Sequence, residues 1–164
     1  MSDKFESFQK SCIKWILSEE NLSYYSHSIY VKKCRQARIL PVSAKFDFND
    51  LILFYKVVNQ LLPLNLPEYL TLFDGNSRLR STHLDRFSYV CSLQPKGNSN
   101  NLLDKSFFYR THSMWNHLPL DIREINCVSS FREKLTEHLW KQVLNDCSTD
   151  PDATLEDFCL SDDD

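Results

Sequence analysis

Apolar residues recur along most of this chain with the three-to-four-residue spacing of one face of an α-helix. This pattern predicts amphipathic helices, and it covers residues 4–17, 47–62, 104–118 and 130–144. The side chains that we expect to form the core lie in or beside these segments. They are Trp15, Phe54, Tyr55, Phe107, Trp115, Pro119, Phe131 and Leu135.

Residues 106–139 predict two helices joined by a sharp corner. Pro119 ends the first helix, because proline lacks a backbone N–H and its ring clashes with the preceding turn. Asp104 is the expected N-cap of that helix. Ser130 and Glu133 have the spacing of a capping box, which predicts that the second helix begins there. The apolar faces of the two helices are expected to pack against each other or against an upstream segment.

One segment alternates with the period of a β-strand instead. Over residues 86–94 apolar and polar side chains alternate, which predicts a half-buried strand. A strand needs a hydrogen-bonded partner, and residues 78–84 are the nearest candidate. Pro67 is expected to open a short helix over residues 67–73, since its missing N–H costs nothing at the first helical position. The sequence therefore predicts a mainly α fold, a small helical domain with one short strand or hairpin in the middle.

The length of 164 residues suits one domain with a tail. Hydrophobic residues make up 42% of the chain, which is enough for a core, and no apolar run is long enough to cross a membrane. We expect a helical region over 1–62, an extension over 63–144 that contains the β element 78–94, and a disordered acidic tail over 145–164. The charged first residues do not resemble a secretory signal, so we expect the protein in the cytoplasm or nucleus.

The net charge of −3 conceals an uneven distribution. All 19 lysines and arginines lie within residues 1–144, whereas the last 20 residues contain 8 of the 22 acids and no base. The body of the protein is therefore mildly basic, which permits contacts with phosphate without requiring them. The tail has too few apolar residues to offset the entropy of ordering.

Side chains that bind metals or catalyse reactions do not form a convincing pattern in this sequence. His112 and His117 are five residues apart, which differs from the i, i+4 pair that binds zinc on one helical face. The adjacent acids are Glu19–Glu20 and Asp162–Asp164, and neither group lies on a rigid turn suited to magnesium. We therefore expect no catalytic residue, no metal site and no cofactor.

Basic residues cluster over residues 31–45, which contain five bases and no acid. Lysine and arginine side chains in such a cluster can neutralise the phosphates of a nucleic acid. The candidate nucleic-acid-binding residues are Lys32, Lys33, Arg35, Arg38, Arg78 and Arg80, with Tyr24, Tyr25 and Tyr30 as candidates for stacking on bases. The alternative, which residue chemistry alone favours, is a solvated basic surface with the tyrosines half in the core.

Six short motifs follow one another between residues 5 and 140. They are Phe5–Lys10 with Lys14–Ile16, Tyr24–Tyr25 with Ile39–Val42, Asn49–Leu51 with Phe54–Lys56, Arg78–Ser81, Phe107–Arg110 with Trp115–Pro119, and Ser130–Arg132. In this order they resemble the region that follows the catalytic palm in reverse transcriptases of non-LTR (LINE-type) retrotransposons. Each motif is short, and their common order makes the resemblance specific.

The resemblance implies a helical thumb and the extension beyond it, which in that family grip the template–primer duplex while the palm performs the chemistry. The palm would precede residue 1, so we expect no polymerase activity from this chain alone. The partners that the resemblance implies are an RNA–DNA duplex and the missing palm. His27 and Ser28 stand where the family often has arginine, and the terminal zinc knuckle of some relatives has no counterpart here.

Two other classes of function remain open. One is a helical protein-interaction module derived from a transposable element, which would use residues 107–139 and the acidic tail. The other is a hydrolase, which would need three polar side chains that converge in one pocket.

Overall fold

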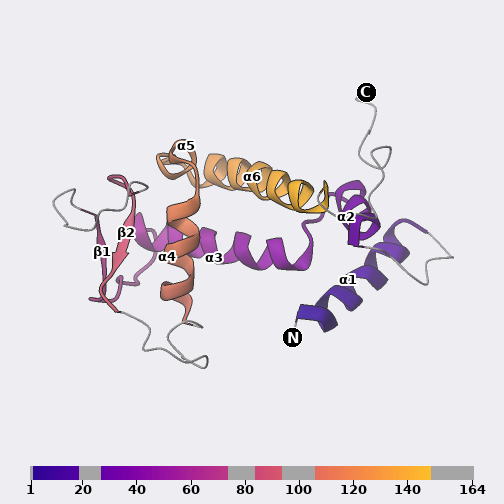
Figure 1. Ribbon diagram of the computed structural model, residues 1–164, viewed down its shortest axis with the longest axis horizontal. Helices are drawn as coiled ribbons and strands as arrows, with labels where there is room; N and C mark the ends of the chain where they lie inside the picture. Colours follow the sequence, from indigo (N-terminus) through magenta and orange to yellow (C-terminus); the bar gives the residue numbers. More distant parts are fainter. Residues whose placement is uncertain (1, 19–26, 74–83, 94–105, 149–164) are drawn as a thin grey trace. The chain divides into compact units, whose positions relative to one another are not determined.

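The computed structural model describes residues 2–18, 27–73, 84–93 and 106–148, and Figure 1 shows their course. The fold is mainly helical with one two-stranded antiparallel hairpin, which confirms the predicted fold class. The elements are α1 (Ser2–Ile16), α2 (His27–Gln36), α3 (Val42–Val58), β1 (Leu70–Leu72), β2 (Tyr89–Cys91), α4 (Phe107–His117), α5 (Leu120–Arg123) and α6 (Val128–Ser148). Among the described helices, none combines the length and the apolar character that a membrane crossing requires.

The chain divides into two compact units, and the division does not fall between residues 62 and 63, where the sequence suggested a domain boundary. Unit 1 consists of Met1–Phe46 and Thr136–Asp164, and unit 2 consists of Asp47–Leu135. Helices α3 and α6 each continue from one unit into the other.

The core of unit 2 is a group of aromatic rings from three helices that pack on one another. Tyr55 of α3 stacks on Phe131 of α6 with a centroid separation of 4.2 Å, and Phe54 packs on Trp115 of α4 at 5.4 Å. All four rings are buried, and so is Leu135. Aromatic pairs contribute attraction beyond the apolar area that they bury, so these rings join the three helices into one core.

Two residues predicted for this core lie outside it. Phe107 is only half-buried and makes an edge-on contact with the neighbouring ring of Phe108. Pro119 is exposed, because the chain turns at this residue and its ring faces away from the core. The carbonyl of Pro119 accepts hydrogen bonds from the N–H groups of Ile122 and Arg123, so this residue opens α5 after ending α4.

The hairpin pairs β1 with β2 in antiparallel register, with Leu70 opposite Cys91 and Leu72 opposite Tyr89. The strand predicted around residue 90 is therefore present, but the helix predicted over residues 67–73 is wrong. The β-branched and aromatic residues of this segment suit a strand once a partner strand is available. The segment predicted as the partner of this strand was 78–84, and its residues 78–83 lie outside the described residues.

Side chains of α4 hold the hairpin along β2, and Figure 1 shows this helix beside the strand. The Asn116 amide accepts a hydrogen bond from the N–H of Tyr89 at 2.9 Å and donates one to the carbonyl of Tyr89 at 2.7 Å. The indole N–H of Trp115 donates to the carbonyl of Phe87 at 2.8 Å. Asn116 thus satisfies backbone groups of β2 as a neighbouring strand would.

A buried arginine links the turn before β2 to the corner between α4 and α5. The Arg123 guanidinium binds both carboxylate oxygens of Asp85, at 2.9 and 2.6 Å, and donates to the Ser88 hydroxyl at 3.0 Å. Its Nε donates to the carbonyl of Leu118 at 2.9 Å. A bidentate arginine–carboxylate pair fixes the relative orientation of its two side chains as well as adding stabilising energy. Arg123 and Asp85 therefore attach the hairpin to the corner between α4 and α5.

Two residues after the ends of helices α2 and α3, the backbone is left-handed although neither residue there is glycine. Arg38 and Gln60 have φ values of 55° and 57°. After α3 the N–H of Leu61 donates to the carbonyl of Lys56 and the N–H of Gln60 to that of Val57, which is a Schellman motif. Helix α3 thus ends at Val58, before the predicted end at residue 62. It also begins at Val42, before the predicted start at residue 47, since the carbonyl of Pro41 accepts a hydrogen bond from the N–H of Lys45.

The predicted ends of helices α4 and α6 are partly correct. Helix α4 ends at His117, just ahead of Pro119, as predicted, and its N-cap is Ser106, while Asp104 lies outside the described residues. Helix α6 begins at Val128, so the predicted capping box is wrong and Ser130 lies inside the first turn. The helix also runs four residues past its predicted end to Ser148. The remainder of the acidic tail, residues 149–164, lies outside the described residues.

Unit 1 has its own core, and Trp15 is not part of it. The core consists of Ile13, Tyr30, Val31, Cys34 and Cys147, against which Leu17, Trp140, Val143 and Leu144 pack. Trp15 is 86% exposed, so its prediction as a core residue is wrong. Helix α1 instead turns Gln9 inward, where its amide donates to the carbonyl of Leu40 at 2.9 Å and accepts a hydrogen bond from the hydroxyl of Tyr30.

Candidate nucleic-acid interface

The basic residues of α2 lie around the buried face of a short helix. Tyr30, Val31 and Cys34 turn toward the core of unit 1, and the residues between and after them turn away from it. Lys32 and Lys33 are half-buried, whereas Arg35 and Arg38 are exposed. The local amphipathic pattern thus separates Arg35 from the apolar side of α2, and Arg38 follows two residues after the helix ends.

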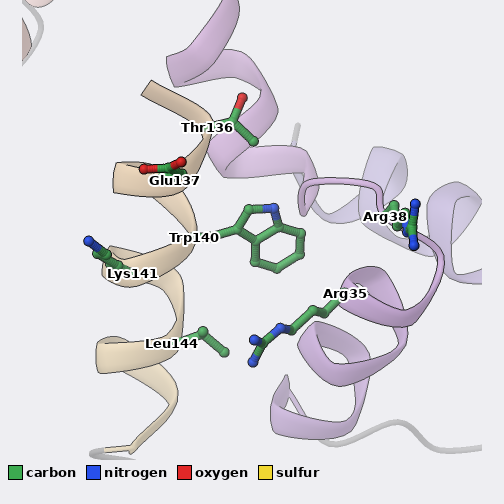
Figure 2. A pocket seen from close by; sticks show the side chains of 7 residues that line it. All are labelled: Arg35, Arg38, Thr136, Glu137, Trp140, Lys141 and Leu144. Carbon is green, nitrogen blue, oxygen red and sulfur yellow. The ribbon is translucent and has the colours of Figure 1, made fainter. Parts of the chain in front are cut away.

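Arg35 and Arg38 line a pocket with side chains of α6. The lining consists of Arg35, Arg38, Thr136, Glu137, Trp140, Lys141 and Leu144, all of unit 1, and we call it the α2–α6 pocket (Figure 2). Its volume is about 500 Å³. Three cationic and one anionic side chain line it, which gives a net charge of +2 at neutral pH.

The two arginine side chains are available for a ligand. Within the described part of the chain, neither the Arg35 nor the Arg38 guanidinium forms a hydrogen bond or an ion pair. A guanidinium presents a planar fork of N–H donors that matches the oxygens of a phosphate. The pocket can therefore bind an anion of that geometry.

Trp140 is the aromatic residue of the pocket, and the sequence did not single it out. It follows Leu139 in α6 and is half-buried, because part of the indole packs against the core of unit 1. Figure 2 shows the indole pointing from α6 into the space toward α2, and Arg35 reaching into the same space from the other helix. The available signal was an aromatic residue beside the apolar stripe of α6, but only the fold brings it to the arginines.

Tyr30 does not have the role that the sequence suggested. Its ring is 1% exposed, and its hydroxyl donates to Gln9 and accepts a hydrogen bond from the N–H of Val42 at 3.3 Å. Burial raises the pKa of this hydroxyl well above its ordinary value of 10.0. The prediction that Tyr30 stacks on bases is therefore wrong.

Four other candidates for nucleic-acid contact lie outside the described residues. They are Tyr24, Tyr25, Arg78 and Arg80. Of the two positions where the resemblance led us to expect arginine, His27 is exposed and Ser28 is buried.

The described residues contain no group of three or more His, Cys, Asp or Glu side chains that would hold a metal ion. The α2–α6 pocket is lined by no serine, cysteine or histidine, so it does not assemble a hydrolase triad. Among the described cysteines, Cys127 is the exposed one, and it is hydrogen-bonded to the Ser129 hydroxyl at 2.9 Å.

Several residues of the motifs that carry the resemblance make structural contacts in unit 2. Asp50 and Arg110 form an ion pair between α3 and α4. Trp115 and Asn116 bind the backbone beside β2, and Phe131 belongs to the aromatic core. These contacts explain why such residues occur at these spacings without any role for a ligand.

Comparison of the chain with family models, with curated proteins and with solved structures gives no match.

Proposed function

We propose that this chain is a non-catalytic segment of a reverse transcriptase of the non-LTR retrotransposon type, and that it holds nucleic acid for a catalytic palm. The support from sequence is the set of motifs in family order along residues 5–140. On this proposal the palm, an RNA-directed DNA polymerase, performs the chemistry, and this chain acts in the cytoplasm or nucleus without polymerase activity of its own.

The observation that carries the proposal is the α2–α6 pocket, whose lining includes Arg35, Arg38 and Lys141. Each cation that neutralises a phosphate releases a condensed counterion, which makes binding favourable and dependent on salt. Lys32 and Lys33 lie on α2 with Arg35 and extend the basic character of the surface of this helix. Arg78 and Arg80 remain candidates for further phosphate contacts.

Replacement of both arginines tests this proposal. Fluorescence anisotropy with a labelled RNA–DNA duplex and a labelled single strand, at graded salt, should show weaker binding for Arg35→Gln/Arg38→Gln than for the unaltered chain. For the duplex, the slope of log affinity against log salt should fall by about 0.9 for each phosphate that the variant no longer neutralises.

The matched control is Arg86→Gln/Arg132→Gln, which removes the same charge from exposed residues of unit 2. It should leave the affinity within about twofold, because neither residue lines the α2–α6 pocket. The proposal fails if the unaltered chain binds no nucleic acid at low salt, or if the two double variants lose affinity equally.

A protein-interaction module remains the second candidate, favoured by the exposed apolar face of α1. Phe8 and Trp15 are 70% and 86% exposed, and Phe5 and Ile16 are each 50% exposed. Contiguous exposed apolar side chains mark interaction surfaces in many proteins. This face lies in α1, whereas the sequence pointed to residues 107–139 as the interacting helices.

A further inference from the structure

We propose that the α2–α6 pocket holds an unpaired nucleotide, with its base stacked on Trp140 and its phosphate bound by Arg35 and Arg38. This inference rests on the proposed function and names the kind of nucleic acid that the site selects. It goes beyond phosphate contact, because phosphates alone do not distinguish a single strand from a duplex.

Trp140 has the features of a fixed stacking platform. The indole is half-buried against the core of unit 1, so it keeps a defined orientation, yet it still lines the pocket. Leu144, one helical turn further along α6, lines the pocket as well and adds an apolar surface. Stacking of bases on aromatic side chains tolerates any sequence, because every base presents a π-face.

The polar side chains of the pocket place the phosphate opposite the indole. Arg35 reaches from α2 toward the space that Trp140 enters from α6 (Figure 2). Glu137 also lines the pocket, and its carboxylate repels a phosphate, so the phosphate is expected on the α2 side with the arginines. A volume of about 500 Å³ lies within the usual range of small-ligand pockets, and it suits one nucleotide better than a continuous duplex.

A duplex presents no free base face to this platform. Its bases are stacked on their neighbours, and a side chain reaches a base face only where a nucleotide is unstacked, at a loop, a bulge or an end. The site should therefore prefer a single strand, or the frayed end of a duplex, over the interior of a helix. Binding of the duplex interior would use the arginines alone.

The decisive probe is an abasic oligonucleotide, which retains the phosphates and lacks the bases. Trp140→Leu should weaken binding of a single-stranded oligothymidylate by about tenfold or more. It should change the affinity for an abasic strand of equal length, or for a closed hairpin duplex, by less than about twofold. Trp140→Phe, which keeps an aromatic face, should restore most of the affinity.

Trp15→Leu is the matched control, because Trp15 belongs to the same unit but lies exposed on α1. It should bind every probe as the unaltered chain does. An equal decrease in affinity for oligothymidylate and abasic strand in Trp140→Leu, with unchanged thermal unfolding, would overturn the inference. So would failure of Trp140→Phe to bind better than Trp140→Leu.

The inference and the proposed function fail in different ways. If Arg35→Gln/Arg38→Gln weakens binding of every probe while Trp140→Leu binds all of them normally, the nucleic-acid function stands and the stacking site is wrong. If the unaltered chain binds neither oligothymidylate nor duplex at low salt, both are wrong.

Discussion

At the scale of single residues, the cysteines show how position controls thiol chemistry. Cys34 is buried in unit 1, and desolvation raises its pKa to about 12. Cys127 is exposed at the start of α6, where hydrogen bonds from the Ser129 hydroxyl and from the backbone of Ser130 and Ser129 stabilise the thiolate. These bonds lower its pKa from 9.0 to about 7, so Cys127 is the thiol with the greater fraction of thiolate at neutral pH.

Alkylation of Cys127 by iodoacetamide should therefore follow a titration centred near pH 7. The pKa is lowered, so the thiolate and its reactivity appear as pH rises through about 7 rather than 9. Ser129→Ala removes the first of the hydrogen bonds and should move the midpoint upward. The readout is the rate of modification at Cys127 by peptide mass spectrometry across pH 5–10. Identical midpoints in folded and urea-unfolded protein would contradict this expectation.

At the scale of elements, two arginine–carboxylate pairs of unit 2, Arg123 with Asp85 and Arg86 with Glu124, provide a comparison within one fold. Arg123 and Asp85 have side chains that are 4% and 30% exposed, whereas Arg86 and Glu124 are 77% and 40% exposed. Only the first pair also binds Ser88 and a backbone carbonyl. The buried pair should therefore matter for the attachment of the hairpin, and the exposed pair should matter little.

Arg123→Met should lower the free energy of unfolding by about 3 kcal/mol, because it removes the guanidinium that binds the Asp85 carboxylate, the Ser88 hydroxyl and the Leu118 carbonyl. Arg86→Met should lower it by no more than about 1 kcal/mol, because water screens an exposed pair. Urea unfolding followed by circular dichroism measures both values. If the two variants are destabilised equally, Arg123 does not join the hairpin to the corner.

Periodicity predicted α1, α3, α4 and α6, because each of these helices carries its own repeating pattern. The strand β1 could not be predicted in the same way, since three residues become a strand only through pairing with β2. The prediction of which face of α1 is buried was wrong for a related reason. The sequence correctly identified the apolar face of this helix, but the hydrogen bonds of Gln9 with Tyr30 and Leu40 turn a different face toward the core.

The candidate site was partly predictable for the same physical reason. Arg35 and Arg38 belong to a local run of basic residues, so composition alone identified them. Trp140 contributes to the pocket only because the fold places α6 beside α2, and no local sequence pattern predicts this packing of two distant helices. Tyr30 was misassigned because its spacing does not reveal that its hydroxyl has partners inside the core.

At the scale of the whole molecule, charge is divided between a basic body and an acidic end. Residues 149–164 contain seven acids and no base, and the last core residue of unit 1, Cys147, precedes them. Removing residues 149–164 changes the formal net charge from −3 to +4. Because these residues follow the core in sequence, we expect the deletion to leave the thermal unfolding of the body unchanged.

Deletion of residues 149–164 should strengthen binding of nucleic acid at low salt, because seven negative charges no longer repel or compete with phosphates. The increase should shrink as salt rises, since the Debye length falls to about 8 Å at 0.15 M. A full-length variant with the seven acids replaced by Asn and Gln should reproduce the increase if charge is its cause. An interaction module that acts through its tail would instead lose its partner on deletion. Unchanged or weaker binding of nucleic acid after deletion would therefore favour that second function over the first.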